Sequence, residues 1–124
     1  MIITPLGWMM GGLLNTYESG YKDWIARTQE VFRRHPPALY AAGHDHSLQL
    51  LESGDVAGLY VVSGAGARER VTTVTDLPET IFAHAAEGFV AIDFERAGEE
   101  ERIVLRIVEP MVSPDTPVFE YVLD

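Results

Sequence analysis

Hydrophobic positions near the start of the chain recur at helical spacing. Between Ser19 and Pro37 the sequence reads SGYKDWIARTQEVFRRHPP, and its apolar side chains fall three or four residues apart, as in an amphipathic helix. The stripe consists of Trp24, Ile25, Thr28, Val31 and Phe32. The two prolines that end the run cannot continue a helix. We therefore predict a helix that begins at about Ser19 and ends before Pro36.

Three short apolar runs follow the helix and predict strands. The run ALYAA, at 38–42, is uninterrupted, which is typical of a strand buried on both faces. The runs SLQLLE and AGLYVVSG are two further strands, joined by the turn-forming SGDVAG. Because the helix leads straight into a buried strand, we expect half of a parallel βαβ unit here.

The rest of the chain divides into an irregular stretch and a set of alternating strands. From Ala65 to about Glu87 the sequence favours irregular structure, with one short helical possibility at 77–85. Beyond it, apolar and polar residues alternate in GFVAIDFE, RIVLRIVEP and VFEYVL, which predicts half-buried antiparallel strands with RAGEEE as a hairpin turn. The side chains expected to face the core are Val90, Ile92, Phe94, Ile103, Leu105, Ile107, Phe119, Tyr121 and Leu123.

This order of elements predicts a mixed α+β fold that consists mostly of strands and has one clear helix. Residues 1–20 contain Pro5 and four glycines, so we expect a loop-rich lead-in there. A chain of 124 residues with 47% hydrophobic and 23% charged residues has the composition of one globular domain.

Charge and cysteine content exclude several classes of function. The formal net charge is -10, whereas binding to nucleic acid or to an anionic membrane needs clustered Lys and Arg, so we expect neither partner. The chain has no cysteine, which excludes thiolate zinc sites, disulfides and cysteine nucleophiles. The apolar start, MIITPLGWMMGGLLN, is too short and too broken to span a membrane.

Two of the four histidines stand in YAAGHDHSLQ, directly after the predicted strand at 38–42. In open α/β sheets, ligands bind beyond the carboxyl ends of strands, and Gly43 permits a sharp turn there. His44 and His46 are therefore candidate ligands for zinc, iron or manganese. A solvent-facing polar turn explains the pair as well, and a tight metal site needs at least one more ligand.

The glycine-rich SGAGAR, at 63–68, also follows a predicted strand. It is not the dinucleotide-binding pattern, because Glu69 stands where a third glycine is required. Two interpretations remain open for this stretch. It is either a loop whose small residues allow close approach of another segment, or one wall of a site beside GHDH.

The run YAAGHDHSLQLLESGDVAGLYVVSGAGARE resembles the last motif region of the calcineurin-like metallophosphoesterases, and most of all their tartrate-resistant, purple-type acid phosphatase branch. The specific likeness spans Tyr40 to Ala67. It implies an αββα sandwich with a two-metal centre at the strand ends. By the same resemblance His44 would bind one metal and His46 the other, the ions would be iron, zinc or manganese, and the substrate would be a phosphate ester.

The other motifs of that family do not occur in this chain. They are Asp-x-His, Gly-Asp-x-x-Asp, Gly-Asn-His and a further lone histidine, and they carry the remaining metal ligands. The resemblance therefore implies that residues 1–124 are the C-terminal portion of a phosphoesterase domain, inactive alone. Such a portion would leave apolar sheet surface uncovered and would need either a missing N-terminal half or a homo-oligomer.

Two further functions remain open. A degenerate half of a phosphoesterase can serve as a non-catalytic module that dimerises or binds a partner protein. Alternatively, His44 and His46 complete a metal site across a symmetric dimer, in which case metal binding and dimerisation are coupled.

Overall fold

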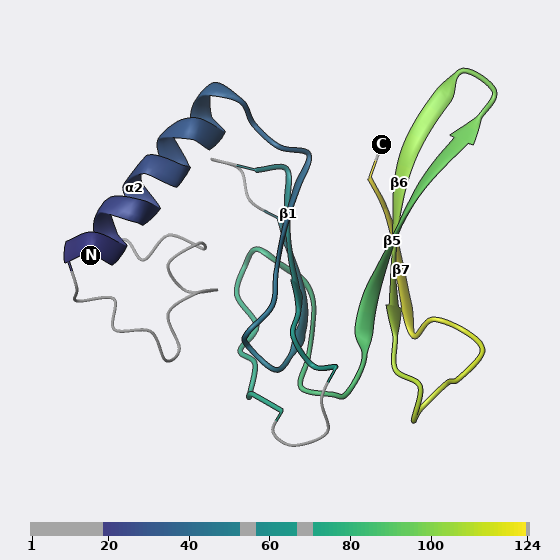
Figure 1. Cartoon of the computed structure of the whole chain (residues 1–124). Coiled ribbons are helices and arrows are strands. Elements are labelled where there is room, and N and C mark those ends of the chain that lie inside the picture. The colour runs from purple at the N-terminus through teal and green to yellow at the C-terminus, as the bar shows by residue number, and fades with distance from the viewer. Residues whose placement is uncertain (1–18, 53–56, 67–70, 124) are drawn as a thin grey trace.

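The computed structural model describes residues 19–52, 57–66 and 71–123, which fold into one helix and two β-sheets arranged as three layers (Figure 1). This is the mixed α+β fold, mostly strands, that the sequence predicts. Most of the expected lead-in, residues 1–18, lies outside the described residues. The elements are α2 (Ser19–Arg34), β1 (Leu39–Ala42), β2 (Leu48–Glu52), β3 (Leu59–Ser63), β4 (Thr80–His84), β5 (Phe89–Ala97), β6 (Glu100–Val108) and β7 (Phe119–Leu123).

Helix α2 occupies the predicted range. The N–H of His35 donates to the carbonyl of Val31 at 2.9 Å, immediately before the prolines end the helix. Ile25 packs against a buried cluster on the four-stranded sheet, and Phe32 meets Tyr40 edge to face with ring centroids 5.3 Å apart. The helix thus forms the outer layer on one face of this sheet (Figure 1).

The four-stranded sheet has the strand order β1-β3-β2-β4. β1 and β3 run parallel, and β2 pairs antiparallel with β3 and β4. The chain before α2, on which the expected βαβ unit depends, lies outside the described residues. The prediction that β1 is buried on both faces is wrong, because Ala41 is exposed and the rest of the strand is only half-buried. Among the described strands β1 lies at the edge of the sheet, and the fully buried positions belong to β2 and β3.

Strand β4 lies inside the stretch that the sequence favours as irregular with a short helix. That prediction is wrong for TIFAH, which is extended. The segment pairs antiparallel with β2, so that Phe82 lies opposite Leu50, and a bulge follows between Leu50 and Leu51. A run this short has no decisive period of its own, and its pairing with β2 fixes the extended structure.

The hydrophobic core has two parts, one on each face of the four-stranded sheet. The larger part fills the space between the two sheets, and its buried members are Leu48, Leu50, Leu59, Val61, Ala65, Leu105 and Ile107. The smaller part lies on the side of helix α2 and consists of Leu51, Ala57, Tyr60 and Val62. Successive residues of β2 and β3 therefore enter opposite cores, which is why these strands read as uninterrupted apolar runs.

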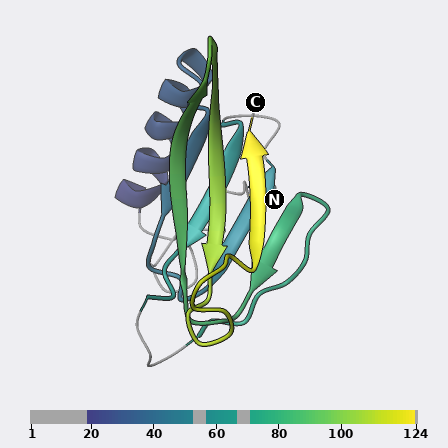
Figure 2. The ribbon, with the colours of Figure 1, turned by 90° about the vertical axis from the view of Figure 1, so that its right-hand side faces the viewer.

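The three-stranded sheet has the order β5-β6-β7 and is antiparallel throughout. Within the predicted RAGEEE turn, only Gly98 and Glu99 connect the two nine-residue strands β5 and β6. Gly98 takes a φ of +72°, which a residue without a Cβ adopts readily. Figures 1 and 2 show that the hairpin extends past the shorter strands of the other sheet.

The inward side chains of this sheet form three rows across β5, β6 and β7. Two rows pack against the four-stranded sheet as predicted, and they consist of Val90, Ile107, Phe119, Ile92, Leu105 and Tyr121. The third row is Phe94, Ile103 and Leu123. The prediction that Phe94 faces the core is wrong, because its exposed fraction is 79%. Ile103 and Leu123 of the same row pack against the core cluster as predicted, whereas Phe94 belongs to β5, the edge strand of this sheet among the described strands.

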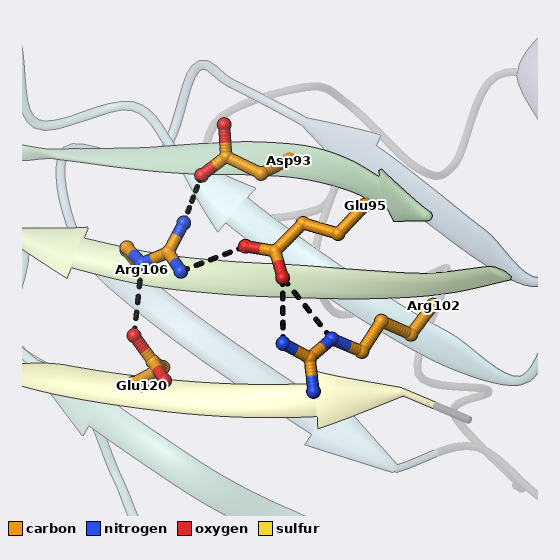
Figure 3. Close-up of polar contacts among 5 residues, drawn as sticks. All are labelled: Asp93, Glu95, Arg102, Arg106 and Glu120. Carbon is orange, nitrogen blue, oxygen red and sulfur yellow. Dashed lines mark hydrogen bonds and ion pairs between the residues drawn. The ribbon is translucent and has the colours of Figure 1, made fainter. Parts of the chain in front are cut away.

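The outer face of the three-stranded sheet carries a network of ion pairs (Figure 3). The guanidinium of Arg106 donates to the Glu95 carboxylate at 3.0 Å and to that of Glu120 at 2.8 Å. It also donates to Asp93, and Arg102 donates to Glu95 at 2.8 Å. Hydrogen bonds from Arg102 and then Arg106 lower the pKa of the Glu95 carboxyl.

Candidate metal site

The side chains that could carry chemistry lie at one end of the four-stranded sheet, where its strands begin or end. This edge is the one at the strand ends and not the lateral edge formed by β1. The parallel strands β1 and β3 both end there, and the histidine loop (Gly43–Ser47) and the glycine loop (63–66) lie at or just beyond those ends. β2 begins and β4 ends at the same edge, because Leu48 lies opposite both Ser63 and His84. The two candidate ligands therefore lie beyond the carboxyl end of a parallel strand, where ligands bind in such sheets.

The backbone of His44 is strained. Its φ is +85°, in a region that residues with a Cβ rarely occupy and that costs about 1–3 kcal/mol. The His44 side chain is exposed, and that of His46 is half-buried. A conformation of this cost persists only where the surrounding structure fixes it.

Hydrogen bonds fix the second half of the histidine loop. The N–H of Ser47 donates to the carbonyl of Asp45 at 2.8 Å, which closes a tight turn around His46. His46 also pairs with Thr72, whose N–H donates to the His46 carbonyl at 2.8 Å and whose Oγ1 accepts from the His46 N–H at 3.3 Å. The segment around Thr72 therefore braces the loop from outside the sheet.

Gly64 fixes the first half of the loop by close contact. A Cβ built on Gly64 would lie 2.0 Å from the carbonyl oxygen of Asp45 and 3.2 Å from the nitrogen of His44. The N–H of Gly64 also donates to the carbonyl of Ser47 at 3.3 Å. Of the two interpretations of the glycine-rich stretch, the close approach of another segment is therefore confirmed, and that segment is the histidine loop. The role of the glycine loop as a wall of a metal site stays a prediction.

A buried polar pair lies where the loop enters β2. The Nε2 of Gln49 donates to the Oγ of Ser47 at 2.8 Å, and both residues are almost fully buried. The Oε1 of Gln49 is buried and has no hydrogen-bond partner among the residues that the structure describes. The pair anchors Ser47, whose main-chain groups contact Asp45 and Gly64 as described above.

Asp45 separates the two histidines and is half-buried. Burial raises the pKa of its carboxyl, and the neighbouring imidazoles of His44 and His46 oppose that rise when they are protonated. A metal held by the two histidines would act on Asp45 in the same direction as those protons.

A second histidine at this end of the sheet, His84, contacts the carboxylate of Glu109. His84, the last residue of β4, places its Nδ1 2.6 Å from Oε1 of Glu109, which follows β6 and is only 2% exposed. The contact joins the two sheets. Sequence reasoning missed it because His84 falls in the stretch predicted as irregular and Glu109 follows an ordinary strand. An isolated Glu after an apolar run, as in VEP, is the only sequence signal.

The described residues supply two candidate metal ligands at the histidine loop and no complete set. Among residues 19–52, 57–66 and 71–123, no group of three or more His, Cys, Asp or Glu side chains is placed to hold a metal ion. His35, at the end of helix α2, is not brought into such a group. In the same residues no helix is long and apolar enough to cross a membrane.

Comparison with known proteins identifies a fold and no family. No protein-family model matches the chain, and no curated protein matches it. A solved structure of GAP50, described as the anchor in the inner membrane complex of Plasmodium, is similar with a TM-score of 0.56 and 19% sequence identity. The match covers 88% of this chain but 30% of the GAP50 chain. At that identity the likeness shows the fold alone.

Proposed function

We propose that this chain is the C-terminal portion of a calcineurin-like metallophosphoesterase domain, nearest to the purple-type acid phosphatases. In this proposal His44 and His46 each bind one ion of a two-metal centre, formed by iron, zinc or manganese. The observation that carries the proposal is the strained His44 backbone, held at a strand end by the close contact between Gly64 and Asp45. Strain of this kind is concentrated at functional sites.

The histidine loop supports this role because contacts within the chain fix its backbone conformation. Positive φ at His44, the Ser47–Asp45 turn and the Thr72 pair leave the loop backbone little freedom. A preorganised pair of imidazoles loses little entropy on binding a metal. A solvent-facing polar turn needs neither the strain nor the close contact with Gly64.

The donor set fits two ligands of such a centre and no more. When bound, the metal pair would polarise a phosphate ester and activate a hydroxide. The contribution of this chain is to hold His44 and His46 at the sheet edge, with the remaining ligands supplied from outside it. We therefore expect weak metal binding and no phosphatase activity from residues 1–124 alone.

Calorimetric titration of the chain with Zn²⁺ or Mn²⁺ tests the proposal. Weak binding should be measurable, and His44→Gln or His46→Gln should each reduce it, because in this proposal each imidazole binds a separate ion. The double substitution should abolish it. The matched control is His35→Gln, an exposed histidine at the end of α2, which should leave the titration unchanged. Binding that survives both loop substitutions would contradict the metal role.

Sequencing the gene upstream of the Met1 codon tests the family. An in-frame reading that contains Asp-x-His, Gly-Asp-x-x-Asp and Gly-Asn-His would supply the missing ligands. A stop codon followed by a ribosome-binding site would contradict the enzyme proposal for this chain.

A non-catalytic, partner-binding module is the second candidate function. It is favoured by the lack of a third ligand among the described residues and by a structural neighbour, GAP50, that is described as an anchor. The two candidates differ in what the histidines do. If the chain is such a module, His44→Gln and His46→Gln should leave both its stability and its association with partners unchanged.

A further inference from the structure

Thr72 contacts the main chain of His46 from outside the sheet. It is an exposed residue in the irregular stretch that precedes β4. Its N–H donates to the His46 carbonyl at 2.8 Å, and its Oγ1 accepts from the His46 N–H at 3.3 Å. The two residues are 26 positions apart in the chain. Thr72 therefore holds the main chain of one candidate ligand on both sides of its Cα.

The hydroxyl of Thr72 takes the place that a main-chain carbonyl has in a sheet. In an antiparallel hydrogen-bonded pair, the N–H and C=O of one residue bond the C=O and N–H of the residue opposite. Thr72 makes one of these bonds with its N–H and the other with Oγ1. Any residue except proline can make the first bond, whereas the second needs a side-chain acceptor close to the backbone. The residue type at position 72 therefore matters to the histidine loop.

The glycine loop and Thr72 act on different ligands. A Cβ on Gly64 would approach Asp45 and His44, and the positive φ also occurs at His44. The hydrogen bonds of Thr72 join it to His46. In the proposed function each histidine binds a separate ion. The fold thus fixes the two ligands separately, His44 by the glycine loop and His46 by Thr72.

We propose that Thr72 is a positioning residue for His46. Its hydroxyl fixes the His46 main chain in the geometry that presents the imidazole to its metal ion, and it has no such role for His44. This role rests on the proposed function, because it belongs to the same site. A ligand that is fixed before binding loses less conformational entropy when the ion binds. Loss of the hydroxyl should therefore weaken metal binding at His46 and leave binding at His44 unchanged.

Zinc titration followed by NMR tests the proposal, because the carbon-bound imidazole protons of His44 and His46 report on each ligand separately. His44→Gln and His46→Gln assign the two sets of signals. Thr72→Val removes the hydroxyl, keeps the N–H and changes the shape of the side chain little. It should weaken Zn²⁺ binding at His46 about two- to tenfold, the effect of one hydrogen bond. Thr72→Ser keeps the hydroxyl and should bind Zn²⁺ as the wild type does.

The matched control is Thr73→Val, which makes the same change at the next residue, also exposed, and should leave both histidines unchanged. A second measurement follows the hydrogen bond itself without metal. The His46 amide proton should exchange with solvent faster in Thr72→Val than in the wild type or Thr72→Ser, because it has lost its acceptor. Urea denaturation of the three variants separates this local effect from a loss of global stability.

Three outcomes would overturn the role of Thr72 and leave the metal site intact. In the first, Thr72→Val binds Zn²⁺ at His46 as tightly as the wild type. In the second, binding at His44 and at His46 weakens equally, so that Thr72 supports the whole loop or the fold. In the third, Thr72→Ser behaves like Thr72→Val, so that the hydroxyl is not responsible. In each case the wild type still binds Zn²⁺ through both histidines, and the proposed function stands.

A wild type whose histidine signals do not respond to Zn²⁺ would contradict the proposed function and, with it, the role of Thr72. Unchanged exchange of the His46 amide in Thr72→Val would overturn the role of Thr72 whatever the metal does, because the hydroxyl would then not hold the loop. The wild-type titration therefore distinguishes failure of the site from failure of its positioning residue.

Discussion

The two sheets share one core but are built on different principles. The central strands of the four-stranded sheet are five residues long and buried on both faces, so nearly every side chain of β2 and β3 contributes to packing. β5 and β6 have nine residues, alternate apolar with charged positions, and turn a network of ion pairs outward (Figure 3). The four-stranded sheet therefore tolerates few substitutions in its strands, and its strand ends can hold loops in strained conformations. The three-stranded sheet packs against one face of the four-stranded sheet, and among the described strands its edge strand β5 pairs only with β6.

The largest expected effect is loss of packing between the sheets. Leu105 lies on the inner face of β6 with no exposed surface, whereas its neighbour Val104 is buried on the outer face. Leu105→Ala should lower the free energy of unfolding by about 2–5 kcal/mol through a cavity in the shared core. Val104→Ala should cost about 1–2 kcal/mol, since it removes less apolar surface. Urea denaturation compares them, and equal losses would show that the outer face is packed as tightly as the inner.

The contact beneath the histidine loop should be the next most sensitive. Gly64→Ala brings a Cβ against the Asp45 carbonyl, which is main chain and has little room to move. We expect a loss of about 1–3 kcal/mol in unfolding free energy together with weaker Zn²⁺ binding. Gly66→Ala is the matched control, because a Cβ there meets nothing within 4 Å. If the two variants unfold alike, the contact at Gly64 does not hold the loop.

The smallest effect should come from the outer ion pairs, and it should depend on pH. The folded-state pKa of Glu95 lies below its ordinary value of 4.5. Its stabilising contribution is therefore present above that pH and is lost as the pH falls through the lowered value. Arg106→Met should reduce stability at neutral pH and flatten its acid dependence, measured by urea denaturation at several pH values. High salt should shrink the difference, and a difference that persists in high salt would argue against an electrostatic origin.

Sequence reasoning succeeded where a local pattern and the tertiary environment agree. Helix α2 has its own period and its own proline stop, and β2 and β3 are apolar enough to be strands in any context. The alternation of β5, β6 and β7 likewise identified the inner face, although Phe94 on that face is exposed and not buried. Phe94 is exposed because alternation gives the face on which a side chain lies but not whether another segment covers that face at an edge strand.

The remaining differences come from neighbours that the sequence does not name. β4 was missed because its strand structure depends on pairing with β2. The burial of β1 was predicted wrongly because a short apolar sequence can form either an edge strand or a central strand. At the candidate site, GHDH and SGAG were identified separately, and their contact through Gly64 needed the parallel pairing of β1 with β3. The His84–Glu109 contact joins residues 25 positions apart on different sheets, for which no local signal exists.

The strand order β1-β3-β2-β4 also determines when the candidate site can assemble. β3 lies between β1 and β2, although the chain reaches β2 first. β2 and β3 form a local hairpin, whereas β1 can join only a β3 that is already in place. The histidine loop spans the end of β3 and therefore closes after the hairpin downstream of it has formed. During synthesis the two imidazoles are made before Gly64 but reach their positions only after Gly64 has left the ribosome.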